Sequence, residues 1–156
     1  MRLNNAHALK SFEREIGNVH LRDKSIGVLC PVSYELYRRL AERARYFFEE
    51  SSRDAAKKRY DIALFHLEQA LQLGIKAYML RTKGDSPKVH DLGMLIKLTE
   101  NQCLAKLTEG MWYDVSILND AYIASRYLAR EYSEKEYRSA RSFVRGALKC
   151  LGIIES

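Results

Sequence analysis

Three side chains with complementary chemistry recur at helical spacing in the second half of the chain. Asn119, Tyr122 and Arg126 are separated by three and four residues, so a helix places an amide, a phenol and a guanidinium on one face. A guanidinium binds phosphate oxygens and a tyrosine ring stacks on a base, so this face suits a phosphate joined to an aromatic ring. The same spacing is typical of an arginine that ties helices together or lines a dimer interface. Both interpretations stay open.

Two histidines and a lysine add further groups that could do chemistry. His66 lies at the edge of an apolar helical face, where we expect either a hydrogen bond to a neighbouring helix or a role in a site. His90 stands at the start of a helical segment and could pair with Asp91, cap the helix or act in catalysis. Lys76 lies on a narrow polar strip of the same helix as His66, and it is a further binding candidate.

Other catalytic signatures do not occur in the sequence. It contains no metal-ligand spacing, no glycine-rich phosphate loop and no Ser-His-Asp ordering, which disfavours a metal, Walker-type or acyl-transfer enzyme. We therefore expect no metal and no cofactor. Cys30, Cys103 and Cys150 are odd in number and far apart, which favours buried reduced thiols over a disulfide framework.

Length and charge narrow the class of protein. A chain of 156 residues is sufficient for one single-core domain. The net charge of +6 arises from 26 basic and 20 acidic residues, and it is compatible with an RNA, nucleotide or acidic-protein partner. No apolar run approaches the roughly 20 residues that cross a bilayer, and the N-terminus lacks the pattern of a secretory signal. We expect a cytoplasmic protein without a membrane partner.

Apolar residues recur with the helical period and not with the alternation of strands, so we expect an all-α fold. Short connections favour an antiparallel up-and-down bundle of five to six helices in residues 31–156, preceded by a partly irregular N-terminal extension in residues 1–30. The expected helices are Pro31 to Glu50, Asp54 to Arg81, Val89 to Thr99, Asn101 to Thr108, Asp114 to Ala129, and a last helix that opens with the capping box at Ser133.

The segment Tyr60 to Arg81 is the expected central helix, because it is apolar around most of its circumference. A strip of small residues, including Ala70 and Gly74, would let a neighbouring helix approach closely. Between the later helices, Trp112 and Tyr113 are expected in a turn, tucked against the bundle. The last helix carries a basic stripe that is either a solvated face or an RNA track. Its residues are Arg138, Arg141, Arg145 and Lys149.

Four pieces of the sequence together resemble a known family. They are YDIALFHLEQA at Tyr60 to Ala70, Lys76-Ala77, His90-Asp91-Leu92, and YIASRY at Tyr122 to Tyr127. In this combination they resemble the HEPN domain, the helical domain of higher eukaryotes and prokaryotes that is associated with nucleotide binding. The similarity extends over about Ser33 to Leu151.

The resemblance implies an antiparallel helical bundle that forms a homodimer. Domains of this family are often encoded beside a minimal nucleotidyltransferase. They are linked to nucleotide binding or to metal-independent RNA cleavage in toxin–antitoxin and defence systems. Cleaving members use an arginine followed, after four to six residues, by a histidine. The imidazole can relay protons, and the guanidinium can stabilise charge on the phosphate.

The chain departs from that pattern after Arg126, where the corresponding positions hold Glu131, Tyr132 and Ser133. We therefore expect a homodimeric binding module for a nucleotide, a nucleic acid or a partner nucleotidyltransferase, and we assign no catalytic residue. One alternative is an atypical, toxin-like ribonuclease in which Arg126 acts with His90 or His66. The other is a purely structural dimerisation domain. The expected binding residues are Asn119, Tyr122, Arg126, Tyr127 and Lys76.

Overall fold

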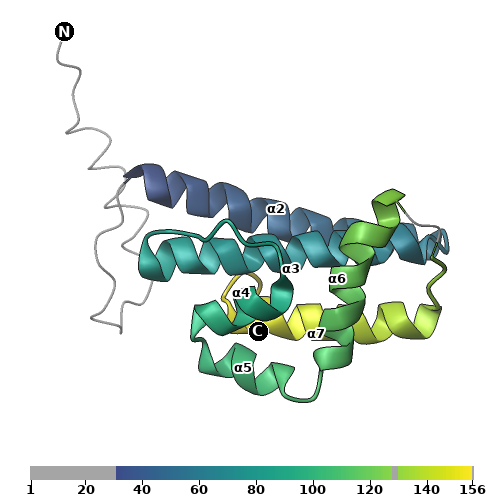
Figure 1. Ribbon diagram of the computed structural model, residues 1–156. Helices are drawn as coiled ribbons and strands as arrows, with labels where there is room; N and C mark the ends of the chain where they lie inside the picture. The colour runs from purple at the N-terminus through teal and green to yellow at the C-terminus, as the bar shows by residue number, and fades with distance from the viewer. Residues whose placement is uncertain (1–30, 128–129, 156) are drawn as a thin grey trace, which may run out of the picture.

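The computed structural model describes residues 31–127 and 130–155. Within these ranges the chain is all-α, as predicted, and it forms a helical bundle without strands (Figure 1). The expected extension in residues 1–30 lies outside the described residues, so the domain boundary at residue 30 stays a prediction. The helices are α2 (Pro31–Ala56), α3 (Tyr60–Lys83), α4 (Leu92–Thr99), α5 (Gln102–Thr108), α6 (Trp112–Tyr127) and α7 (Glu134–Cys150).

Helices α2 and α3 form a long antiparallel hairpin, and α3 lies in the middle of the bundle (Figure 1). Helix α3 packs against α2 along its length and also against α4, α6 and α7, so the prediction of a central helix is confirmed. Helix α6 crosses α3 steeply, whereas α7 runs beneath it. The α3 residues from Ala63 to Leu80 that face these neighbours are buried.

The boundary between the first two helices differs from the expected one. Helix α2 continues through the segment expected to break it and ends at Ala56, and α3 begins at Tyr60 instead of Asp54. Ser51 is accommodated because its hydroxyl donates a hydrogen bond of 2.7 Å to the carbonyl of Phe48, within the helix. The reversal occurs instead at residues 57–59, where Lys58 adopts a positive φ of 59°.

Glycine has a clear structural purpose at two places in α3. Gly84 ends the helix in the left-handed conformation, with φ of 76°, as predicted. Gly74 faces α7, and a Cβ atom at this position would lie 2.6 Å from Cδ2 of Leu148. The expected close approach of a neighbouring helix is therefore confirmed, and α7 is that helix.

Side-chain caps determine where the later helices begin. Asp91 and Asn101 cap α4 and α5, and Ser133 with Glu136 forms the predicted capping box of α7. The expected position of Trp112 and Tyr113 is wrong. Both residues belong to the first turn of α6 and are exposed, at 46% and 67%, because this turn begins on the outer side of the bundle.

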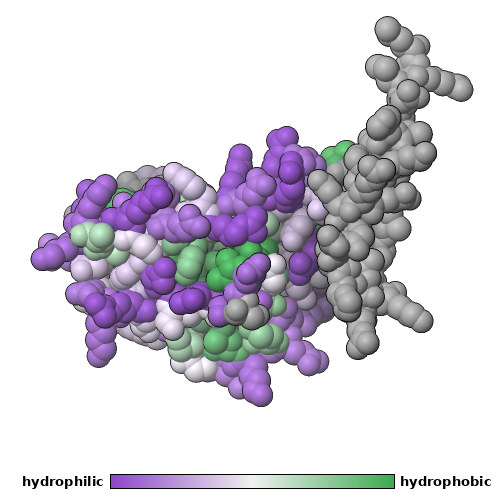
Figure 2. All heavy atoms as spheres, turned by 180° about the vertical axis from the view of Figure 1, so that it is seen from behind, coloured by the Kyte–Doolittle hydropathy of each residue, from purple (hydrophilic) through white to green (hydrophobic). Residues whose placement is uncertain are grey.

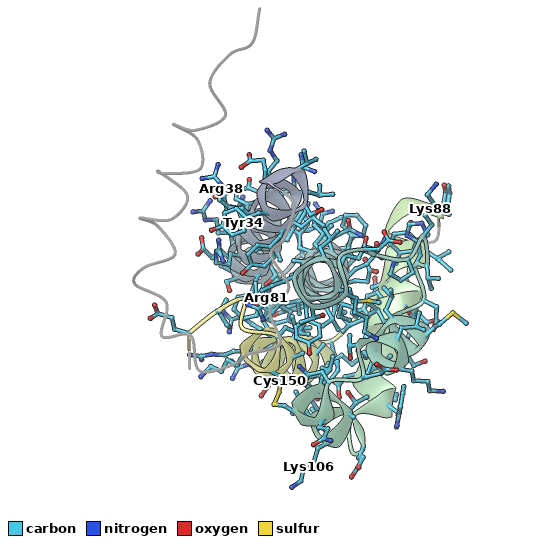
Figure 3. The ribbon with its side chains drawn as sticks, turned by 90° about the vertical axis from the view of Figure 1, so that its left-hand side faces the viewer. Tyr34, Arg38, Arg81, Lys88, Lys106 and Cys150 are labelled. Atoms are coloured by element: carbon cyan, nitrogen blue, oxygen red, sulfur yellow. A yellow bond between two sulfur atoms is a disulfide. The ribbon has the colours of Figure 1, made fainter. Side chains whose placement is uncertain are left out.

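The prediction of reduced thiols is wrong for Cys103 and Cys150, and Cys30 lies outside the described residues. Cys103 of α5 and Cys150 at the end of α7 form a disulfide, although they are 47 residues apart in the sequence. The packing of α5 against α7 brings their Cα atoms within 5.5 Å, a separation suited to a disulfide. Figure 3 shows Cys150 on the lower side of the bundle, below Arg81. Arg81 donates a hydrogen bond of 3.0 Å to the carbonyl of Leu151, so α3 also holds the end of α7.

Candidate functional site

A polar cluster lies where α3, the start of α4 and α6 meet. Its innermost member is Glu68 of α3, whose side chain is completely buried. Gln72 donates a hydrogen bond of 2.7 Å to one carboxylate oxygen of Glu68, and Gln69 donates one of 2.6 Å to the other. A buried carboxylate is tolerated when its oxygens are hydrogen-bonded in this way.

The cluster extends from Gln72 to His90. The Nδ1 atom of His90 lies 3.3 Å from the amide oxygen of Gln72, and the backbone carbonyl of His90 accepts a bond of 3.5 Å from the amide nitrogen. Because an amide oxygen only accepts hydrogen bonds, Nδ1 must carry the proton. In the neutral ring, Nε2 is then an acceptor, and the residue is exposed.

Tyr122 of α6 lies beside this histidine. The two rings are nearly parallel, with an interplanar angle of 11° and centroids 6.0 Å apart. His90 is exposed and Tyr122 is half-buried, so the pair forms part of the molecular surface. Arg126 follows Tyr122 on α6 by one helical turn, which places its backbone on the same side of that helix. The Arg126 side chain lies outside the described residues.

Asn119 attaches α4 to α6. Its side-chain oxygen accepts a hydrogen bond of 3.1 Å from the backbone amide of Leu92, and its amide nitrogen donates one of 3.0 Å to Asp91. The other carboxylate oxygen of Asp91 accepts from Met94 and caps α4. Asn119 thus positions the helix start beside His90, and its own polar atoms are engaged in that task.

The remaining predicted binding residues lie in different surroundings. Lys76 lies one turn beyond Gln72 on α3, and burial lowers the pKa of its ammonium group while the nearby Glu68 carboxylate partly opposes that shift. Tyr127 is 75% exposed. It lies about 140° around α6 from Tyr122 at the helical repeat, so the two tyrosines point in different directions.

His66 belongs to a separate contact. Its Nδ1 atom lies 2.7 Å from a carboxylate oxygen of Asp54 in α2, and its ring packs on Phe47 at 5.4 Å between centroids. The predicted hydrogen bond to a neighbouring helix is therefore confirmed. The imidazole is turned towards α2, on a different side of α3 from the Gln72 cluster.

The basic stripe of α7 is partly engaged in the fold. Arg141 stacks over the ring of Phe48 at 4.6 Å and donates a hydrogen bond of 3.1 Å to Ser52, so it joins α7 to α2. Arg138 forms an ion pair with Glu134 one turn earlier on the same helix. Arg145 is exposed. These contacts are typical of a solvated helix face more than of a continuous RNA track.

Two members of the cluster, Glu68 and Gln72, were not among the predicted site residues. The signal that could have identified them is a carboxylate and an amide four residues apart in an otherwise apolar helix, because such groups need buried partners. Over residues 31–127 and 130–155, the structure contains no group of three or more His, Cys, Asp or Glu side chains that could hold a metal ion. None of the described helices is long and apolar enough to cross a membrane.

The protein is an all-helical domain that carries His90 and Tyr122 side by side at its surface, with His90 hydrogen-bonded to Gln72 of the central helix. The family described as "HEPN domain" matches residues 37–154. The chain belongs to this family, and the match covers the described helices from the first turns of α2 to the end of α7. No curated protein matches the chain. The family supports a nucleotide-binding or ribonuclease-like module in general terms.

Proposed function

We propose that this HEPN domain binds a nucleotide or nucleic acid on the surface formed by His90, Tyr122 and Arg126. The observation that carries the proposal is the parallel His90 and Tyr122 pair, which the Gln72 hydrogen bond braces from the central helix. The nearly parallel rings of the exposed His90 and the half-buried Tyr122 offer an aromatic surface on which a base can stack. A guanidinium one turn further along α6 is suited to the phosphate of the same ligand.

The fixed positions of His90 and Tyr122 favour a binding site over a chance contact between two surface side chains. Gln72 is fixed by the buried Glu68, and Asn119 fixes the chain that carries His90. The aromatic pair therefore loses little conformational freedom when a ligand binds, which favours affinity. Asn119 acts in this proposal as a positioning residue, and Lys76 and Tyr127 lie at the periphery.

A titration of nucleotides and short single-stranded RNA tests the proposal. Wild type is compared with Arg126→Ala, Tyr122→Ala and the control Arg145→Ala, which removes an exposed arginine from α7. We expect the two site variants to lose affinity at least tenfold, while the control changes it by less than about twofold, because one charge-assisted bond or one stacked base contributes 1–3 kcal/mol. Absence of binding by wild type, or equal binding by all variants, contradicts the proposal.

A ribonuclease is the second candidate, and one observation favours it. Gln72 holds the proton on Nδ1 of His90 and leaves Nε2 as an acceptor at the surface, which is the form a general base needs. With Arg126 stabilising the phosphate, such a histidine could deprotonate a 2′-hydroxyl. Metal-independent cleavage of RNA by wild type, abolished in His90→Gln and Arg126→Ala, would establish it. Retained cleavage in His90→Gln would exclude this histidine.

We also infer that the outer face of α6 is a self-association surface. Tyr113, Ile123 and Tyr127 share this face and are all more than half exposed, which is unusual for large apolar side chains. The variant Ile123→Glu should shift a homodimer towards monomer in light scattering. A second variant, Ser116→Glu, places a charge at an exposed position between these apolar residues and tests the same face of α6. A wild-type monomer at all concentrations contradicts the inference, and a partner nucleotidyltransferase would then be the occupant to test next.

A further inference from the structure

The disulfide between Cys103 and Cys150 lies at the margin of the bundle. Figure 3 shows Cys150 on the lower side, where the end of α7 meets α5. Cys103 is exposed and Cys150 is half-buried. A disulfide is reduced when an external thiolate attacks one of its sulfur atoms, so the rate depends on access. This disulfide is therefore open to a reductant while the protein is folded, and Cys103 is the more accessible of its two residues.

The end of α7 is held by groups that do not belong to α5. Arg81 of α3 donates a hydrogen bond of 3.0 Å to the carbonyl of Leu151, and Arg45 of α2 donates one of 3.0 Å to the carbonyl of Ile153. The side chains of Leu151 and Ile153 are also buried in the core. Cys150 therefore keeps its position whether or not it is bonded to Cys103.

Helix α5 is held more weakly. It has seven residues, a length at which a helix depends on packing for its stability, and its buried residues are Leu104 and Thr108. Leu107 packs on Gly146 of α7, where an added Cβ atom would lie 3.0 Å from Cδ2 of the leucine. The amide of Asn101, just before α5, donates a hydrogen bond of 3.2 Å to the carbonyl of Cys150. Of the two segments that the disulfide joins, α5 is therefore the one that can move.

We propose that the Cys103–Cys150 disulfide is a redox-active site that controls the attachment of α5 to α7. A dithiol reductant attacks with one thiolate, forms a mixed disulfide and displaces the other cysteine of the pair as a thiolate. Its second thiol then resolves the mixed disulfide. Two electrons pass to the protein, which gains two thiols, and the reductant leaves as a disulfide. The reverse exchange closes the bond again.

Reduction removes the covalent link and leaves only the non-covalent contacts of α5. Segments with few buried contacts open locally without unfolding the rest of the domain, so the reduced protein detaches α5 reversibly. The hydrogen bonds that position His90 come from Gln72 and Asn119 and do not involve α5. The proposal is therefore independent of the binding function at His90 and Tyr122.

The first test asks whether the disulfide is reducible in the folded protein. The full chain carries Cys30→Ser, so that no third thiol takes part in exchange. Dithiothreitol is added without denaturant, thiols are alkylated, and peptide mass spectrometry identifies them. We expect alkylation of Cys103 and Cys150 only after reductant is added, with an unchanged helical circular dichroism signal. Free thiols before reduction, resistance until urea unfolds the chain, or global unfolding on reduction would each overturn the proposal.

Hydrogen exchange tests the detachment of α5. Amides of residues 105–108, which are hydrogen-bonded within this helix, should exchange at least about thirtyfold faster after reduction, the lower end of the effect of a disulfide on an unfolding equilibrium. Amides of the α2–α3 hairpin are the internal control and should keep their protection. In the same background, Cys103→Ser should exchange like the reduced protein with or without dithiothreitol. Equal protection of α5 in the oxidised and reduced forms would refute the detachment.

An apolar dye gives a second readout of the same step. Detached α5 exposes the side chains of Leu104 and Leu107. Hydrophilic side chains cover most of the rear face of the molecule, and apolar ones gather near its middle (Figure 2), so the quantity to compare is the change in dye fluorescence on reduction. We expect an increase that reverses on reoxidation. Unchanged fluorescence after complete reduction would contradict the release of α5.

Discussion

The two polar regions along α3 differ in how completely their groups are paired. Around Gln72 a series of hydrogen bonds joins the described side chains, from the buried Glu68 carboxylate through Gln72 to His90, and Asn119 on α6 holds the neighbouring start of α4. At the start of α3 the first turn is uncapped, Lys58 is unpaired within residues 31–127 and 130–155, and the Tyr132 hydroxyl has no partner there. The fold therefore preorganises the first region, whereas it leaves polar groups of the second region without partners among the described residues.

The disulfide offers the largest perturbation that leaves both regions intact. Reduction, or the double variant Cys103→Ser with Cys150→Ser, should lower the free energy of unfolding by about 4 kcal/mol, because the bond closes a long loop in the unfolded chain. Urea unfolding with and without reductant measures the change. Ligand affinity of the folded protein should stay constant, so a parallel loss of affinity would show that stability and binding are not separable here.

Removing the Gln72 side chain should disrupt the hydrogen-bonded cluster of Glu68, Gln72 and His90 and lower stability. Gln72→Ala leaves the buried Glu68 carboxylate with one donor fewer and releases Nδ1 of His90, so we expect a loss of about 3 kcal/mol in urea unfolding. The exposed Gln102→Ala on α5 is the matched control and should change stability by less than about 0.5 kcal/mol. Equal effects of the two variants would mean that the cluster is not a stabilising network.

Asn119 should have a smaller effect on stability and a distinct effect on binding. Asn119→Ala removes the hydrogen bonds to Leu92 and Asp91, with an expected loss of about 2 kcal/mol. Because α4 and His90 then lose their anchor on α6, nucleotide affinity should fall even though Asn119 itself is not expected to touch the ligand. An affinity equal to that of wild type, measured on folded protein, would argue against a positioning role.

Removing the unpartnered Tyr132 hydroxyl should instead raise the free energy of unfolding. Tyr132→Phe deletes a buried hydroxyl that has no partner, so the protein should become more stable by about 1 kcal/mol. Thermal unfolding measures this gain, and Tyr113→Phe serves as the exposed control. A loss of stability in Tyr132→Phe would mean that the hydroxyl already has a partner in solution.

Local patterns in the sequence were sufficient to locate most helices and their ends. Gly84, the Ser133 capping box and the apolar period of α3 depend on neighbours within a few residues, and each was predictable for that reason. The end of α2 was not, because Ser51 and Ser52 favour a helix break in isolation. In the fold, Ser51 bonds within its own helix and Ser52 accepts a bond from Arg141 of α7.

The candidate site was predictable only in part. Spacing on one helix associated Asn119 with Tyr122, and the resemblance included His90, but neither revealed that Asn119 serves α4 or that Gln72 orients His90. Tyr127 is adjacent to Arg126 in the sequence yet points to a different side of α6. The direction of Tyr127 follows from the helical repeat, whereas the roles of Asn119 and Gln72 depend on contacts between residues that are 18 to 28 positions apart.

The all-α class, the central helix, the Gly84 C-cap and the Ser133 capping box could be predicted from the sequence alone, because they follow from apolar periodicity and from hydrogen bonds over short distances along the chain. Helix packing alone brings Cys103 to Cys150, buries Glu68 among amide donors and buries the Tyr132 hydroxyl without a partner. Each of these depends on how separate helices pack, since packing brings together groups whose distance along the chain carries no local signal.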